Sequence, residues 1–297
     1  MDIRQLRYFL RIAELRSFTR AADELRVAQP ALSRQVKLME EEFGLHLLHR
    51  HGRGVVLTDA GAALQARLSG LVNDFDRISH DMHALGQGKS PQGSMTLGVP
   101  ISISRQVTMP ILNRCRVALP GVVVRVVEGH SELIAESLTS GRVELALLYG
   151  DHPRRMIASD VLRRDEIVAV TAADAPWADF ASISLQEFER IPLVLPRRPH
   201  ATWAMLDATG VHPGRVIESD TLLEMLQHVH DGAGVTLLAA GAVEQECAAG
   251  TVRIIRPAPP GLSRALVLGR AANHPMPAAA EAVGELIRAE FTAITAG

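Results

Sequence analysis

The sequence of 297 residues contains little cysteine and almost no lysine. Two cysteines, Cys115 and Cys247, cannot form a disulfide framework, and this predicts a protein of a reducing compartment. Lys37 and Lys89 are the only lysines among 31 basic residues. Arginine would therefore make nearly every contact with phosphate or guanine, through its planar fork of donors.

Long apolar segments are also missing. The best candidate, residues 233–243, is too short for a membrane span and contains glycine and threonine. The N-terminus, from Met1 to Gln5, lacks the apolar core of a secretory signal. These absences predict a soluble cytoplasmic protein that does not enter a membrane.

Charge is distributed unevenly. The net charge of −2 excludes a generally cationic protein that coats nucleic acid. Residues 1–60 nevertheless carry ten Lys and Arg against eight Asp and Glu, whereas the remainder carries 21 against 25. A local basic face near the N-terminus is therefore compatible with the sequence, and the length favours two or three domains.

The first sixty residues predict short helices joined by tight turns. Apolar residues recur at helical spacing from Ile3 to Ala13, after Asp2 as a cap. A second helix follows Ser17, and a third extends from about Gln29 to Glu42. This arrangement is typical of a helix-turn-helix, in which the later helix enters the DNA major groove, but it also fits an ordinary helical hairpin.

The next segment favours the first alternative. Residues 47–57 predict a short hairpin with a basic, glycine-containing tip, a wing placed to touch phosphate or the minor groove. His46, His49 and His51 lie close together in sequence, but no strong set of further ligands accompanies them. No metal is therefore expected.

A long helix is predicted from Thr58 to the breakers Gly86, Gly88 and Pro91. Its apolar residues follow a heptad pattern, and the positions between them are strongly polar, which favours a dimer interface over a core helix. The predicted seam consists of Leu64, Leu68, Leu71, Phe75, Ile78, Met82 and Leu85.

Beyond Pro91, strands and helices alternate, which predicts a parallel α/β layer. Two α/β halves with chain crossovers near 160 and 264 would leave a ligand cleft between them. Strands are predicted near 94–99, 122–128, 143–148, 166–171, 192–195, 215–218, 234–238, 252–256 and 264–269, and helices near 104–118, 131–140, 202–209, 220–231, 240–248 and 276–294.

Four motifs closely resemble those of LysR-type transcriptional regulators: Ser17 to Ala22, Gln29 to Gln35, Glu40 to Leu45, and Arg50 to the Thr-Asp-Ala-Gly of 58–61. The resemblance is strongest over residues 3–62 and extends loosely over the chain. Ala28 departs from the usual Ser or Thr, Leu48 from the common Phe, and Ala239-Ala240 from a frequent Pro. None of these departures removes a basic residue or a glutamine of the reading head.

The resemblance implies a fold and its boundaries. A winged helix-turn-helix would occupy residues 1–58, a dimerising linker helix 59–89, and an α/β effector domain like the two-lobed periplasmic binding proteins 90–297. Its lobe I would span about 90–161 and 266–297, and its lobe II about 162–265. Motifs at 98–104, 127–131, 195–200 and 220–221 resemble the nitrogen assimilation control subgroup, some of whose members need no effector.

The resemblance also implies a sequence-specific regulator that binds an interrupted dyad in double-stranded DNA as a dimer or a dimer of dimers. RNA polymerase is a further candidate partner. Arg34 can fork onto guanine, Gln29 can pair with adenine, and Pro30 can contact a thymine methyl, whereas the other candidates suit phosphates. The candidate DNA-binding residues are Gln29, Pro30, Ser33, Arg34, Lys37, Arg50 and Arg53.

A small anionic effector is predicted for the C-terminal part. Hydroxyls fall just after predicted strands or at helix starts, where free N–H groups favour an anion, although ordinary capping explains each of them as well. Arg198 and His200 could clamp a carboxylate or could simply be solvated. The candidate effector-binding residues are Ser102, Ser104, Ser131, Arg198, His200, Thr202 and Thr221.

Two other classes of function fit less well. Residues 88–90 resemble the end of a phosphate loop, 129–133 a nucleophile elbow and 232–234 a dinucleotide fingerprint, but each lacks a required glycine. No catalytic residue and no cofactor are therefore predicted. The solute-binding protein of a transporter would explain residues 91–297, but it requires export and leaves the helix-turn-helix unexplained.

Overall fold

The computed structural model describes residues 1–51, 54–68, 71–72, 75, 91–150 and 155–295. Contacts divide the chain into two compact units, Met1–Gly86 with Ser140–Arg142, and Gln87–Thr139 with Val143–Gly297. In the described ranges no helix combines the length and the apolar character that a membrane span needs.

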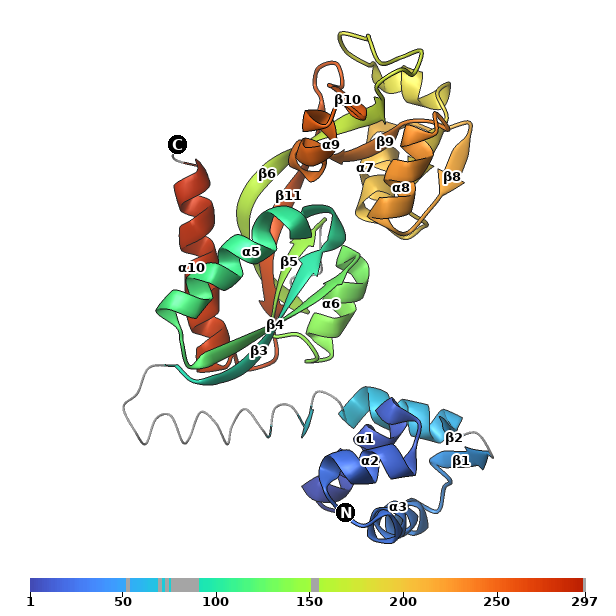
Figure 1. The fold of residues 1–297 in the computed structure, drawn as a ribbon, viewed down its shortest axis with the longest axis vertical. Coiled ribbons are helices and arrows are strands. Elements are labelled where there is room, and N and C mark those ends of the chain that lie inside the picture. The colour runs from blue at the N-terminus through green and yellow to red at the C-terminus, as the bar shows by residue number, and fades with distance from the viewer. Residues whose placement is uncertain (52–53, 69–70, 73–74, 76–90, 151–154, 296–297) are drawn as a thin grey trace. The chain divides into compact units, whose positions relative to one another are not determined.

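The first unit contains α1 (Ile3–Leu15), α2 (Phe18–Leu25), α3 (Gln29–Phe43) and the antiparallel hairpin of β1 (Leu48–His51) and β2 (Gly54–Leu57) (Figure 1). The predicted cap at Asp2 is confirmed, and Ser17 caps the second helix. The Asp2 carboxylate accepts a hydrogen bond from Gln5 N, and the Ser17 hydroxyl accepts one from Arg20 N. Each cap satisfies an N–H group that has no partner inside its helix.

The predicted heptad seam is divided in the structure. Leu68 and Val72 are buried, and Leu64 is partly buried, against the core of the first unit. Leu71 and Phe75 are 55% and 47% exposed. Leu68 packs inside its own chain and has little surface left for a dimer interface, whereas Leu64 keeps part of its surface.

Helix geometry alone does not divide the seam, because Leu64, Leu68, Leu71 and Phe75 lie within about 60° of one another around a helix with 3.6 residues per turn. The division comes from packing, since the core of the first unit reaches Leu68 and Val72 but leaves Leu71 and Phe75 exposed. The three remaining seam residues, Ile78, Met82 and Leu85, lie outside the described residues.

The second unit has two lobes joined by two long strands (Figure 1). Lobe I contains β3 (Gly93–Pro100), α5 (Ile101–Ala118), β4 (Val122–Gly129), α6 (Ser131–Thr139), β5 (Leu145–Tyr149) and α10 (Ala278–Thr295). Lobe II contains η1 (Leu185–Glu189), β7 (Leu193–Leu195), α7 (Ala201–Thr209), β8 (Val216–Glu218), α8 (Leu222–His230), β9 (Thr236–Ala239), η2 (Ala240–Val243), α9 (Glu244–Ala248) and β10 (Val252–Ile255). The strands β6 (Ile157–Ala172) and β11 (Leu262–Ala271) cross between them, which confirms the crossovers predicted near 160 and 264.

The main sheet is mixed, with the strand order β10-β6-β11-β5-β3-β4 and β9 also paired to β6. Strand β3 is parallel to β4 and β5, but β11 is antiparallel to β5 and β6, and β6 is antiparallel to β9 and β10. The prediction of a parallel layer therefore holds for the strands of lobe I and is wrong for the crossover strands. Those strands run in opposite directions because one leaves lobe I and the other returns to it.

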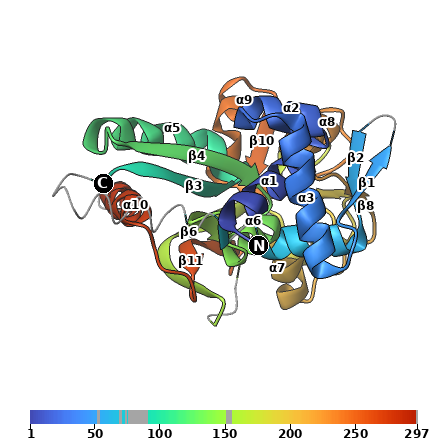
Figure 2. The same cartoon turned by 90° about the horizontal axis from the view of Figure 1, so that it is seen from below.

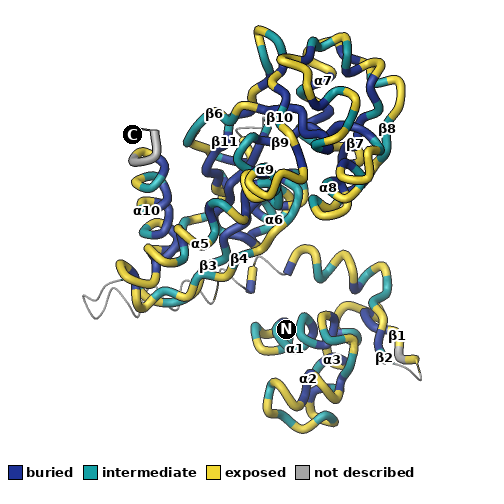
Figure 3. Tube along the Cα trace, turned by 45° about the horizontal axis from the view of Figure 1, so that its top comes forward, coloured by how far each residue is buried: buried dark blue, intermediate teal, exposed yellow. Residues whose placement is uncertain are grey.

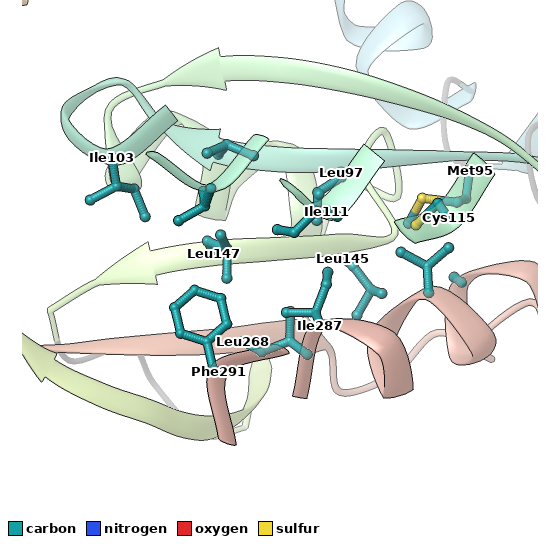
Figure 4. Packing of buried hydrophobic residues seen from close by; sticks show 14 of the residues in the cluster. Met95, Leu97, Ile103, Ile111, Cys115, Leu145, Leu147, Leu268, Ile287 and Phe291 are labelled. Carbon is teal, nitrogen blue, oxygen red and sulfur yellow. The ribbon is translucent and has the colours of Figure 1, made fainter. Parts of the chain in front are cut away.

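Alternation along β5 positions helices on both faces of lobe I. Leu145, Leu147 and Tyr149 pack with α5 and α10, whereas Ala146 and Leu148 pack with α6. Figure 4 shows the first of these clusters, and Figure 2 shows α5 lying along β4. In Figure 3 the buried stretches follow the strands, while the helices alternate between buried and exposed residues. Both faces of the sheet in lobe I are therefore covered by helices.

Candidate functional site

Helix α3 presents one polar face to solvent. Its opposite side buries Leu32, Val36 and Met39 against α1 and α2. Pro30 and Arg34 are exposed on the outer face, and Lys37 is exposed beside Glu41, with 3.6 Å between Lys37 Nζ and Glu41 Oε1. Gln29 and Ser33 are half-buried on the same face. Among the described residues no carboxylate forms an ion pair with Arg34.

The wing is held to α3 by a side-chain carboxylate, whereas the start of α3 has no side-chain cap. Ala28 precedes α3 without a side-chain cap, as its departure from Ser or Thr implied. Glu40 Oε1 accepts hydrogen bonds from Leu47 N (2.8 Å) and Leu48 N (3.2 Å), which fixes the first wing strand to α3. Arg53 and the side chain of Arg50 lie outside the described residues.

A cavity of about 40 Å³ lies between the two lobes of the second unit. Residues at or beside the N-termini of α5, α6, α7 and α8 line it, and helix N-termini favour negative charge. The lining residues are Pro100, Ile101, Ser102, Gly129, His130, Ser131, Tyr149, Pro196, His200, Ala201, Thr202, Leu222, Met225, Leu237, Leu238 and Arg264.

Four of the seven predicted effector residues meet in this cavity: Ser102, Ser131, His200 and Thr202. The Ser131 hydroxyl accepts a hydrogen bond from Tyr149 N at 2.9 Å. The Thr202 hydroxyl accepts one from Arg264 Nη1 at 3.3 Å. Both hydroxyls therefore keep their own proton to donate to a ligand.

The other three predicted residues do not line the cavity. Ser104 is buried and bonds to Thr108 and Glu128. Thr221 caps α8 by accepting from Glu224 N. Arg198 is exposed, donates to both carboxylate oxygens of Asp207 at 2.8 and 2.9 Å, and lies over the Trp203 ring. Its charge is thus matched outside the cleft, and the predicted clamp of Arg198 with His200 is wrong.

Arg264 takes the place that was predicted for Arg198. It lies on β11 opposite Asp165 of β6, is 7% exposed, and has its guanidinium carbon 4.5 Å from the centre of the Tyr149 ring. Burial lowers the pKa of Arg264, while Tyr149, Asp165 and Glu132 act in the opposite sense, and a guanidinium keeps its charge under such conditions. Its Nε atom has no hydrogen-bond partner among the described residues.

Asp165, the carboxylate nearest to Arg264 along the strands, is committed elsewhere. It accepts a hydrogen bond from the Tyr149 hydroxyl and pairs with Arg163 at 2.6 Å. Burial, followed by the charge of Asp165, raises the pKa of Tyr149, so its hydroxyl keeps its proton. The described residues thus leave Arg264 as a buried cation without a carboxylate partner, an arrangement that costs free energy unless an anion joins it.

Two histidines face each other across the cleft. The rings of His130 and His200 lie edge to face with centroids 5.1 Å apart. His130 Nε2 lies 2.9 Å from the carbonyl oxygen of Asp220, so it must be the donor, and His200 Nδ1 accepts from Thr202 N at 3.1 Å. The neutral His200 ring therefore carries its proton on Nε2.

Burial, with the charges of Arg264 and His130, lowers the pKa of His200 from 6.5 to about 3. Between these values the unfolded chain binds a proton that the folded chain does not, so the free energy of unfolding decreases as the pH falls. We expect His200→Asn, which keeps a capping acceptor, to remove about 1–2 kcal/mol of this decrease between pH 6.5 and 5. Urea midpoints of both proteins at the two pH values measure it, and parallel pH dependence would contradict it.

A second and larger cavity, about 240 Å³, lies beside α5 and α10. It is lined by Arg163, Glu244 and Glu290 among others. Arg163 pairs with Asp165 there, and Glu290 pairs with Arg114. Because Arg163 is already paired and the carboxylates of Glu244 and Glu290 also line this cavity, it is less suited to an anion than the cleft is.

Sequence reasoning missed Arg264, Tyr149 and His130. The signal for Arg264 was a lone arginine at an inward position of an apolar strand, since Leu262, Leu266 and Leu268 are buried on the same side. His130 belongs to the motif at 127–131, but the role in effector binding was assigned to its neighbour Ser131.

Comparison with known protein families gives two matches. Residues 3–62 match the bacterial regulatory helix-turn-helix proteins of the lysR family. Residues 88–292 match the LysR substrate binding domain. Together these matches span nearly the whole chain.

Curated relatives and solved structures agree with these matches. The nitrogen assimilation regulatory protein nac of Klebsiella aerogenes is 30% identical over 97% of this chain and 94% of its own length. The protein of the same name from Escherichia coli K12 is 29% identical with the same coverage. A full-length OxyR variant of Pseudomonas aeruginosa has a TM-score of 0.74 at 23% identity, covering 97% of this chain and 95% of that one, and CbnR has 0.70 at 20%, covering 97% and 98%. These two structures share the fold.

Proposed function

The chain belongs to the LysR family of bacterial transcriptional regulators, which bind DNA and carry an effector-binding domain, and on this premise we propose how it reads DNA. It is a regulator and not an enzyme. In the proposal it binds an interrupted dyad in double-stranded DNA as a homodimer or a dimer of dimers. The exposed outer face of α3, with Arg34 not paired to any described carboxylate, is the observation that carries it.

The residues have separate roles in this proposal. Arg34 forks onto guanine, Gln29 pairs with adenine and Pro30 touches a thymine methyl, so these three read sequence. Ser33, Lys37, Arg50 and Arg53 hold phosphates and set the register. Leu71 and Phe75 join the dimer, together with Ile78, Met82 and Leu85.

The domain limits follow the same proposal: DNA binding at 1–58, the linker helix at 59–89 and effector binding at 90–297. A small anionic effector enters the cleft between the lobes, and its differential affinity for open and closed lobes changes how dimers pack on DNA. The regulator works in the cytoplasm, where its DNA lies, and RNA polymerase is a further partner.

Sequencing of DNA fragments bound by the purified protein tests the DNA-binding proposal directly. We expect an enriched site with two inverted half-sites separated by a spacer, because a two-fold dimer presents two α3 helices to successive major grooves. Enrichment of a single half-site without symmetry would contradict the dimeric mode. Fragments without any common sequence would contradict base reading by α3.

The two wing arginines allow a further test of DNA binding. Arg50→Ala and Arg53→Ala should each weaken binding to all DNA sequences alike and reduce the slope of log affinity against log salt by about one unit, because each removes one phosphate contact. Arg253→Ala, an exposed arginine of β10, provides a control of equal charge change. A slope that is unchanged in either wing variant would rule out this role.

A further inference from the structure

The cleft between the lobes contains one permanent charge. Among the lining residues only Arg264 is an arginine, lysine, aspartate or glutamate. It is 7% exposed, and its Nε atom has no hydrogen-bond partner among the described residues. Such a buried cation indicates that an anion completes the site.

Three polar groups beside Arg264 in the cleft are left as donors. The hydroxyls of Ser131 and Thr202 already accept hydrogen bonds, so each has its proton to give. The Nδ1 atom of His200 accepts from Thr202 N, which leaves Nε2–H as the donor. Together with Arg264 these donors favour a ligand that brings acceptors to this side of the cleft.

The charges behind Arg264 limit the ligand to a single negative charge. Asp165 and Glu132 are close enough to stabilise the charge of Arg264, yet neither lines the cavity. Asp165 is itself paired with Arg163, so Arg264 and Glu132 are the charges that a ligand would meet. A second anionic group, or a phosphate monoester with a charge near −2 at pH 7, would find no second arginine or lysine among the lining residues and would be repelled by Glu132.

The remaining wall of the cleft is apolar. Leu222, Met225, Leu237 and Leu238 of lobe II face Pro100 and Ile101 of lobe I. The cavity of about 40 Å³ holds roughly three or four waters, so the part of a ligand that lies there is short. An apolar group that displaces such waters gains affinity without any polar contact.

We propose that the effector is a short monocarboxylic acid, held at its carboxylate by Arg264, Thr202, Ser131 and His200 and at its chain by the apolar wall. The planar carboxylate matches the two parallel donors of a guanidinium. This inference rests on the function proposed above and adds the chemical class of its effector.

A matched set of four-carbon probes tests the class. Butyrate, succinate, butyramide and butylamine carry charges of −1, −2, 0 and +1 on chains of equal length. Isothermal titration of the full-length protein at millimolar concentrations should show binding of butyrate, and binding at least about tenfold weaker for the other three. Equal binding of succinate, or no binding of butyrate, would overturn the proposal.

Two variants show where the probe binds. Arg264→Gln should weaken butyrate by about 10- to 100-fold, whereas Arg198→Gln, which removes an exposed arginine outside the cleft, should not change it. Equal losses in both variants, or none in Arg264→Gln, would place butyrate elsewhere and overturn the proposal.

A variant that is expected to gain binding tests the proposal even if Arg264→Gln does not fold. Leu222 is half-buried in the first turn of α8 on the apolar wall, so Leu222→Arg adds a second cation there. We expect its affinity for succinate to rise by at least about tenfold and to approach that for butyrate. An unchanged preference would contradict the assigned geometry. DNA binding by the same samples separates a failure of this inference from a failure of the proposed function.

Discussion

Replacing Leu71 and Phe75 together by aspartate is expected to convert the assembled regulator into monomers. These two apolar side chains are 55% and 47% exposed within one chain. In a two-fold interface the variant would bury four carboxylates without partners, at a cost of several kcal/mol. We expect the Kd of the dimer to rise by about a thousandfold or more, measured by light scattering or sedimentation.

Phe180→Asp is the matched control, because Phe180 is 41% exposed but belongs to lobe II. It should leave the dimer intact. A dimer that persists in Leu71→Asp with Phe75→Asp would show that the interface does not involve these residues.

Leu68→Ala should behave in the opposite way. Leu68 is 7% exposed and packs in the core of the first unit, so its truncation should lower the stability of that unit by about 2–5 kcal/mol. The protein should still assemble at temperatures where the unit is folded. Dissociation by Leu68→Ala without loss of stability would restore Leu68 to the interface.

The second large effect is expected on the affinity and specificity of DNA binding. Arg34→Ala should lower affinity for the cognate site by about 1–3 kcal/mol per half-site and should relax discrimination at one base pair in each. The reason is that a bidentate arginine discriminates guanine from every other base in the major groove. Competition assays with single-base variants of the site measure both effects.

Lys37→Ala is the control, since Lys37 lies one turn further along the same face. Its loss should weaken specific and random DNA equally, because a phosphate contact carries no sequence information. Its exposed pair with Glu41 contributes little to stability, so the helix should persist. An equal loss on specific and random DNA in Arg34→Ala would make Arg34 a phosphate contact.

The features that were predicted from the sequence depend on interactions between residues close together in the chain, and those that were missed depend on pairing between distant segments. The helices of the first unit, the cap at Asp2 and the wing hairpin were all predicted, because periodicity and capping act over a few residues. Strand β6 was predicted only from residue 166, whereas it begins at Ile157. Its first half is rich in charge and forms a strand because it pairs with β11, about a hundred residues later.

The sequence by itself determined the order of elements, the polar face of α3 and the candidate hydroxyls at Ser131 and Thr202. Only the tertiary structure decided which arginine serves the cleft. Arg198 lies just before α7 and Asp207 lies within it, nine residues later, and their side chains pair outside the cleft. Arg264 reaches the cleft because the register of β11 against β6 and β5 turns it inward over Tyr149, 115 positions earlier. That register depends on pairing between distant segments, which local patterns of residues do not encode.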